Sequence, residues 1–123
     1  WVDMGLTKLH DTDQDVMLSR AWLASAAEVY AKYRTLDSAC SPIYGDLQGL
    51  PPILLQVGSD EILLNDSHRM CEALKSAGNV VRLQVYPQRW HVFQLHAGVL
   101  ADADISLMTT ARFMHDHWRK NNS

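Results

Sequence analysis

Two short strand-like segments that flank a helical segment constrain the fold more than any other feature of this sequence. Residues 53–57 are nearly all apolar and lie between two prolines and Gly58, which is typical of a strand covered on both faces. Residues 80–85 are rich in β-branched side chains and predict a second strand. The segment between them shows helical spacing and ends at Gly78, a residue suited to a left-handed stop. This order predicts a β-α-β unit.

Further helices are predicted on both sides of this unit. Asp13 or Asp15 is the expected cap of a helix before it, and a final helix is expected to begin near Asp102 or Asp104. The helix inside the unit has Asn65, Asp66 or Ser67 as its candidate cap and carries Met70, Leu74 and Ala77 on one face. The apolar faces of the outer two helices are expected to carry Leu18, Trp22, Ala26, Val29, Tyr30 and Tyr33, then Leu107, Ala111, Met114 and Trp118.

The predicted β-α-β unit brings two polar residues to one edge of the sheet. Its crossover makes the strands parallel, so their carboxyl ends point to the same edge, where ligands and catalytic groups gather. Asp60 lies three residues beyond the first strand, and His91 lies six beyond the second. A carboxylate that orients a histidine is the arrangement with which acyl transfer activates a nucleophile. From the residues alone, a surface or capping role for His91 is the commoner outcome in a chain with six histidines.

Composition excludes several other classes of protein. The chain has 123 residues and a net charge of −3 without clustered basic side chains, so we expect no nucleic-acid partner. No apolar run approaches the ~20 residues of a membrane span. Cys40 and Cys71 are too far apart for a disulfide framework or a metal site, so we expect reduced thiols and no cofactor or metal. The sequence does not identify the cellular compartment, and the cytoplasm is slightly favoured.

Three stretches of the chain carry a resemblance to a known family. Residues 41–52 read SPIYGDLQGLPP, residues 57–66 read VGSDEILLND, and residues 90–94 read WHVFQ. In this order and spacing they resemble the carboxyl-terminal part of the hormone-sensitive-lipase-like esterases of the α/β-hydrolase fold family. The opening residues 1–4, WVDM, are similar to the sequence that follows the sixth strand of that family. The resemblance therefore covers essentially the whole chain.

The resemblance implies a fold, an activity and two site residues. Residues 1–123 would form part of an α/β-hydrolase domain, with a cap-like helical segment at 1–40 and a βαβα segment at 41–123. The two strands would be the last two parallel strands of the sheet. Asp60 and His91 match the acid and the base of a Ser-Asp-His triad that hydrolyses a small-molecule carboxylic ester.

The sequence departs from the family pattern at two places. Many relatives have proline after the triad aspartate, where this chain has Glu61, so Glu61 is the second choice for the acid. No stretch matches the Gly-x-Ser-x-Gly nucleophile elbow or the HGGG oxyanion loop. Because the chain starts at Trp1, we expect a processed or truncated product that lacks both and does not hydrolyse esters alone.

The other candidate residues favour structural roles. Ser59 lacks the strand-turn-helix with a glycine on each side that a nucleophile elbow has, so it is interpreted as a turn residue. Ser67 is interpreted as a helix cap. His115 and His117 are two positions apart on a helix and cannot jointly bind one metal. His91, His96 and Asp102 have no compact ligand spacing.

A second interpretation of the function belongs to a different class. The strand at 53–57 would expose an apolar edge without a neighbour, and such an edge invites pairing with another chain. The alternative is therefore a non-catalytic fragment or interaction module. Its partner would be a second copy of the chain, giving a homodimer, or the missing amino-terminal part.

Overall fold

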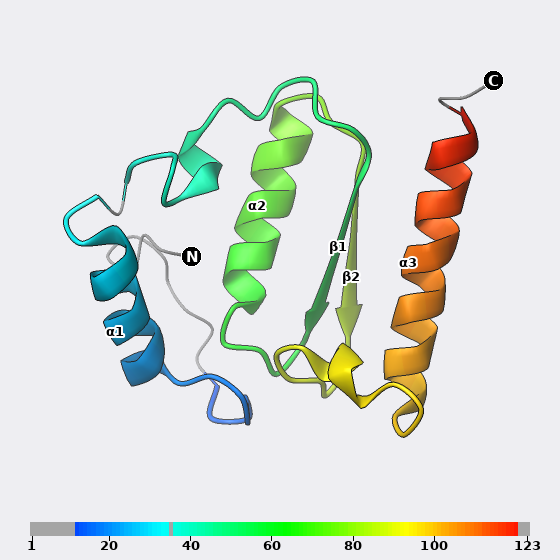
Figure 1. Cartoon of the computed structure of the whole chain (residues 1–123), viewed down its shortest axis with the longest axis horizontal. Helices are drawn as coiled ribbons and strands as arrows, with labels where there is room; N and C mark the ends of the chain where they lie inside the picture. The colour runs from blue at the N-terminus through cyan, green and yellow to red at the C-terminus, as the bar shows by residue number, and fades with distance from the viewer. Residues whose placement is uncertain (1–11, 35, 121–123) are drawn as a thin grey trace. The chain divides into compact units, whose positions relative to one another are not determined.

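The computed structural model describes residues 12–34 and 36–120, which belong to two compact units (Figure 1). The first unit ends at His91 and the second begins at Val92. The first contains α1 (Arg20–Ala31), the short 3-10 helix η1 (Pro42–Tyr44), β1 (Ile53–Gly58), α2 (Leu64–Ser76) and β2 (Val81–Tyr86), and the second contains the 3-10 helix η2 (Phe93–His96) and α3 (Ala101–Lys120).

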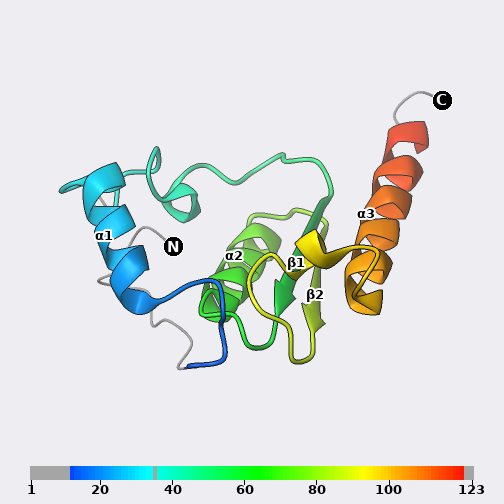
Figure 2. The same cartoon turned by 60° about the horizontal axis from the view of Figure 1, so that its bottom comes forward.

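The first unit contains the predicted β-α-β arrangement. β1 and β2 pair in parallel, with Ile53 opposite Val81 and Gly58 opposite Tyr86. α2 connects the strands and packs against both of them, and the two arrowheads point to the same end (Figure 1, Figure 2). The parallel pair, and with it the shared carboxyl edge, is thereby confirmed.

Burial of β1 is less complete than expected. Val57 and Gly58 are buried, whereas residues 53–56 are only partly covered in the described structure. The prediction of a strand covered on both faces is correct only at the carboxyl end. This end is also the one from which the site is built.

The first helix begins later, and buries another face, than the sequence predicts. Its cap is Ser19, whose Oγ accepts from the Trp22 N–H at 3.3 Å, so the predicted Asp13 or Asp15 cap is wrong. The buried residues are Leu23, Ala27 and Ala31, while Trp22 is 60% exposed. Apolar side chains occur on several sides of this helix, so their spacing could not identify which side is buried. Val29, Tyr30 and Tyr33, which belong to the same expected apolar face, are also exposed.

The other two helices also differ in detail from the prediction. α2 has Leu63 at its cap position without a side-chain bond, so Ser67 lies inside the helix and is not its cap. Gly78 adopts φ 85°, as its predicted left-handed stop requires. In α3 the buried residues include Ala103 and Ser106. The predicted face is wrong for Leu107, Met114 and Trp118, which are exposed.

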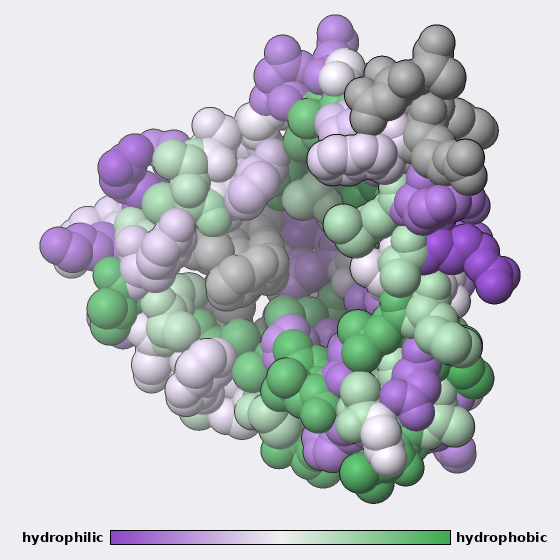
Figure 3. All heavy atoms as spheres, turned by 45° about the vertical axis from the view of Figure 1, so that its right-hand side comes forward, coloured by the Kyte–Doolittle hydropathy of each residue, from purple (hydrophilic) through white to green (hydrophobic). Residues whose placement is uncertain are grey.

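Exposed apolar side chains gather at the beginning of α3 and on the connection before it (Figure 3). Among them are Leu95, Val99, Ile105 and Met108.

No helix within the described ranges is both long and apolar enough to cross a bilayer.

Candidate active site

Three hydrogen bonds join the loops that leave β1 and β2. The Ser59 N–H donates to the Tyr86 carbonyl at 2.8 Å, and the Asp60 N–H donates to the Arg89 carbonyl at 3.0 Å. The Gln88 N–H donates to Ser59 Oγ at 2.8 Å. Ser59 thus has the turn role predicted for it. These bonds hold the segment before His91 against the segment that carries the two candidate acids.

Gly58 makes this close approach possible. A Cβ atom at position 58 would lie 1.9 Å from the Arg89 carbonyl oxygen and 2.4 Å from its carbonyl carbon. Both distances are far below van der Waals contact, and the obstacle is backbone that cannot rotate away. Only glycine therefore fits between the two loops without moving them.

A tight turn after β1 aims Glu61 at His91. The Glu61 N–H donates to the Gly58 carbonyl at 3.3 Å, which closes a four-residue turn. The side chain folds back over this turn, so Oε1 accepts from the Gly58 N–H at 3.0 Å. Oε2 lies 3.1 Å from His91 Nδ1. Both oxygens of the Glu61 side chain, which is only 8% exposed, thus accept hydrogen bonds.

The residue that pairs with His91 in the structure is Glu61, the second choice for the acid, and not the expected Asp60. Asp60 is the third residue of the turn, and its Oδ1 accepts from Ser59 Oγ at 3.0 Å. Successive residues of a tight turn point in different directions, so only one of the two adjacent carboxylates can reach the histidine. Spacing from the strand end locates the loop but not the residue within it.

The environment of His91 suits a general base. A carboxylate can only accept, so Nδ1 carries the proton and Nε2 has its lone pair free for another donor. The side chain is 32% exposed, and within the described residues nothing hydrogen-bonds to Nε2. The Glu61 hydrogen bond raises the pKa of His91 above its ordinary 6.5, partial burial opposes this, and the charges of Glu61 and Asp15 add to it.

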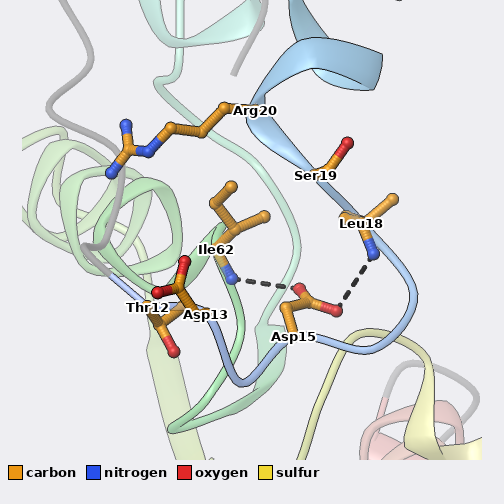
Figure 4. Close-up of a pocket in the computed structure, with 7 residues that line it drawn as sticks. All are labelled: Thr12, Asp13, Asp15, Leu18, Ser19, Arg20 and Ile62. Atoms are coloured by element: carbon orange, nitrogen blue, oxygen red, sulfur yellow. Dashed lines mark hydrogen bonds between the residues drawn. The ribbon is translucent and has the colours of Figure 1, made fainter.

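Asp15 also contacts this site, a role that the sequence analysis did not predict for it. One oxygen accepts from the Met17 N–H at 3.0 Å. The same oxygen accepts from the Leu18 N–H at 3.1 Å, and the other oxygen accepts from the Ile62 N–H at 3.0 Å (Figure 4). Local pattern identifies Asp15 only as a turn or cap residue, and its partner Ile62 is 47 positions away. A cavity of about 270 Å³ adjoins it, lined by Thr12, Asp13, Asp15, Leu18, Ser19, Arg20 and Ile62.

The remaining candidates lie in ordinary surroundings. His115 pairs with the adjacent Asp116 at 3.5 Å, and His117 Nδ1 lies 2.8 Å from the Phe113 carbonyl oxygen within the same helix. In the part of the chain that the structure describes, no group of three potential ligands could hold a metal ion. Cys40 is partly buried and Cys71 is buried, and both are free thiols.

The fold and the paired side chains define a class of α/β protein in which an acid and a histidine meet at the carboxyl edge of a parallel sheet. Comparison with known proteins agrees with this class. A family model for the α/β-hydrolase fold matches residues 2–95. The chain therefore belongs to the α/β-hydrolase fold family, and its structural neighbours are hormone-sensitive-lipase-like members.

Individual relatives are similar over part of their length. An acetyl-hydrolase of Streptomyces hygroscopicus is 31% identical over 118 residues, which are 93% of this chain and 40% of that protein. An esterase of Acinetobacter venetianus is 42% identical over 63% of this chain and 25% of its own length. The crystal structure of the hormone-sensitive-lipase homologue EstE7 from a metagenome library has a TM-score of 0.87 and 32% identity, covering 94% of this chain and 41% of EstE7. This chain thus spans less than half of each relative.

Proposed function

We propose that this chain supplies the acid and the base of a serine hydrolase that cleaves small carboxylic esters. The observation that carries the proposal is the hydrogen bond between Glu61 and His91 across two loops at the carboxyl edge of the sheet. The family of the chain and the names of its relatives, acetyl-hydrolase and esterase, support an ester as substrate.

Each residue of the pair has a distinct role in this proposal. Glu61 fixes the tautomer of His91 and stabilises the imidazolium ion that forms during the reaction. His91 Nε2 takes the proton from the serine hydroxyl as that oxygen attacks the ester carbonyl, and then delivers it to the leaving alcohol. The acyl-serine is hydrolysed by a water molecule that His91 activates in the same way.

The nucleophile in this proposal comes from sequence outside the 123 residues. No Gly-x-Ser-x-Gly stretch occurs among them, and the chain spans 40% of the acetyl-hydrolase it resembles. The complete polypeptide would then contribute the serine elbow and the oxyanion hole. The chain alone would bind part of the substrate without turning it over.

Hydrolysis of a short-chain p-nitrophenyl ester by the complete polypeptide tests this function. We expect turnover that falls by about 10³-fold or more in His91→Ala, because the serine then has no base. His115→Ala is the matched control, since His115 lies on α3 with only a surface partner, and should retain full activity. Full activity of the His91 variant, or turnover by the 123 residues alone, would contradict the proposal.

A further inference from the structure

The segment before α1 is attached to the peptide that follows Glu61. Asp15 Oδ2 accepts from the Ile62 N–H, which belongs to the peptide unit that joins Glu61 to Ile62. A hydrogen bond to this N–H fixes the plane of that peptide and therefore limits rotation about the Glu61 backbone. Figure 4 shows the Asp15 carboxylate between the N–H groups of Leu18 and Ile62.

Within the described residues, the other two hydrogen bonds of the Glu61 backbone are longer. Its own N–H donates to Gly58 at a long 3.3 Å, and its carbonyl accepts from Leu64 at 3.2 Å. The bond to Asp15 is shorter, at 3.0 Å, and it is charge-assisted. Among these three backbone contacts, the one from Asp15 is thus the strongest.

Packing and charge support the same role for Asp15. Ile62 is 2% exposed and packs against Leu23, with Leu18 and Leu63 beside them, so the segment before α1 and the acid loop share a core. Within the described residues, the charged groups that act on His91 are Glu61 and Asp15. Asp15 therefore restrains the acid mechanically and also acts on the base through space.

We propose that Asp15 is a positioning residue that holds Glu61 in the orientation in which it hydrogen-bonds to His91. It touches neither the imidazole nor the reacting atoms, and it acts by fixing the backbone on which Glu61 is carried. This inference rests on the proposed function, because it assigns Asp15 a part in the same reaction. The contact also joins the cap-like segment to the loop that carries Glu61, because Asp15 and Ile62 are 47 positions apart in the sequence.

Variants of the complete polypeptide test this role. Asp15→Ala removes all three acceptor contacts, and Asp15→Asn keeps the volume but presents an oxygen to only one side. We expect kcat to fall by about 10- to 100-fold in Asp15→Ala with little change in KM, and by less in Asp15→Asn. The acid limb of the kcat/KM profile should move to lower pH in both. Asp15→Glu retains a two-oxygen carboxylate and should recover part of kcat.

Asp13→Asn is the matched control, because Asp13 lines the same cavity and makes the same change in charge. We expect wild-type kcat and an unmoved acid limb from it. Each rate is divided by the concentration of active sites titrated with an organophosphate, so that a loss of folded enzyme does not count as a loss of catalysis. If Asp15→Ala does not fold, Asp15→Asn provides the comparison.

Two results separate the inference from the function on which it rests. If Glu61→Gln loses activity while Asp15→Ala and Asp15→Asn both keep kcat within twofold of wild type and leave the acid limb unmoved, the positioning role is wrong and the proposed function stands. If Glu61→Gln and His91→Ala are both fully active, the proposed function itself fails. A lower melting temperature with unchanged kcat per active site would reduce Asp15 to a structural residue and so overturn the inference.

Discussion

At the scale of single residues, the proton on His91 links activity to pH. The hydrogen bond that His91 donates to Glu61 raises the pKa of His91, so the folded protein binds this proton more tightly than the unfolded chain does. The stabilisation is fully present below the unfolded pKa and is lost as pH rises through the folded pKa. In the proposed reaction, activity would follow the opposite direction, because only the neutral imidazole can accept a proton from serine.

In the pH profile of ester hydrolysis by the complete polypeptide, the acid limb is the range over which activity rises as His91 loses its proton. This limb should therefore lie at a higher pH than for an ordinary histidine. We expect kcat/KM to rise with pH through a midpoint above 6.5, the ordinary value for histidine. Glu61→Gln should lower this midpoint, since the amide no longer stabilises the imidazolium. The measurement is kcat/KM between about pH 5 and 9, a window that brackets the titration of histidine. A wild-type midpoint at or below the ordinary value would refute the assigned pairing.

At the scale of elements, the geometry of the site depends on how closely the ends of β1 and β2 approach. Gly58 contributes the N–H that fixes Glu61 and also leaves space for the Arg89 carbonyl. The two requirements act on one residue, so packing and site geometry should change together when it is replaced.

Gly58→Ala should thus reduce both stability and activity. The added methyl group would overlap the Arg89 backbone, and relief of such overpacking typically costs about 1–3 kcal/mol of unfolding free energy. Urea unfolding of the complete polypeptide measures this cost. Gly45→Ala is a milder control, because its Cβ would lie 3.2 Å from the nearest backbone oxygen and Gly45 is far from His91 in sequence. Equal stability of the Gly58 variant and wild type would show that the loops can separate freely.

The same scale shows what the sequence could and could not predict. The parallel strand pair and the stop at Gly78 follow from periodicity and turn chemistry, which are local. The buried face of α1 does not, because Leu23 and Trp22 are both apolar and the choice depends on Ile62. The sequence also could not predict that Glu61 rather than Asp60 contacts His91, since this depends on the direction of side chains in one turn.

At the scale of the whole molecule, the chain has the fold of its family over the part that positions Glu61 and His91. It matches the α/β-hydrolase model over residues 2–95 and spans about two fifths of EstE7. Asp15, Glu61 and His91 come from three distant segments, so the site exists only when the first unit is folded. Pairing through the open sheet edge, with a second copy or with the amino-terminal part, stays a prediction.

The central claim is that Glu61, and not its neighbour Asp60, is the acid that acts on His91. Glu61→Gln and Asp60→Asn are matched variants, because each replaces one carboxylate by the amide of the same shape. We measure kcat/KM for a short-chain p-nitrophenyl ester with the complete polypeptide, per titrated active site. Glu61→Gln should lose about 10²- to 10⁴-fold, and Asp60→Asn should stay within about threefold of wild type. Loss of activity in Asp60→Asn with an active Glu61→Gln would contradict this account.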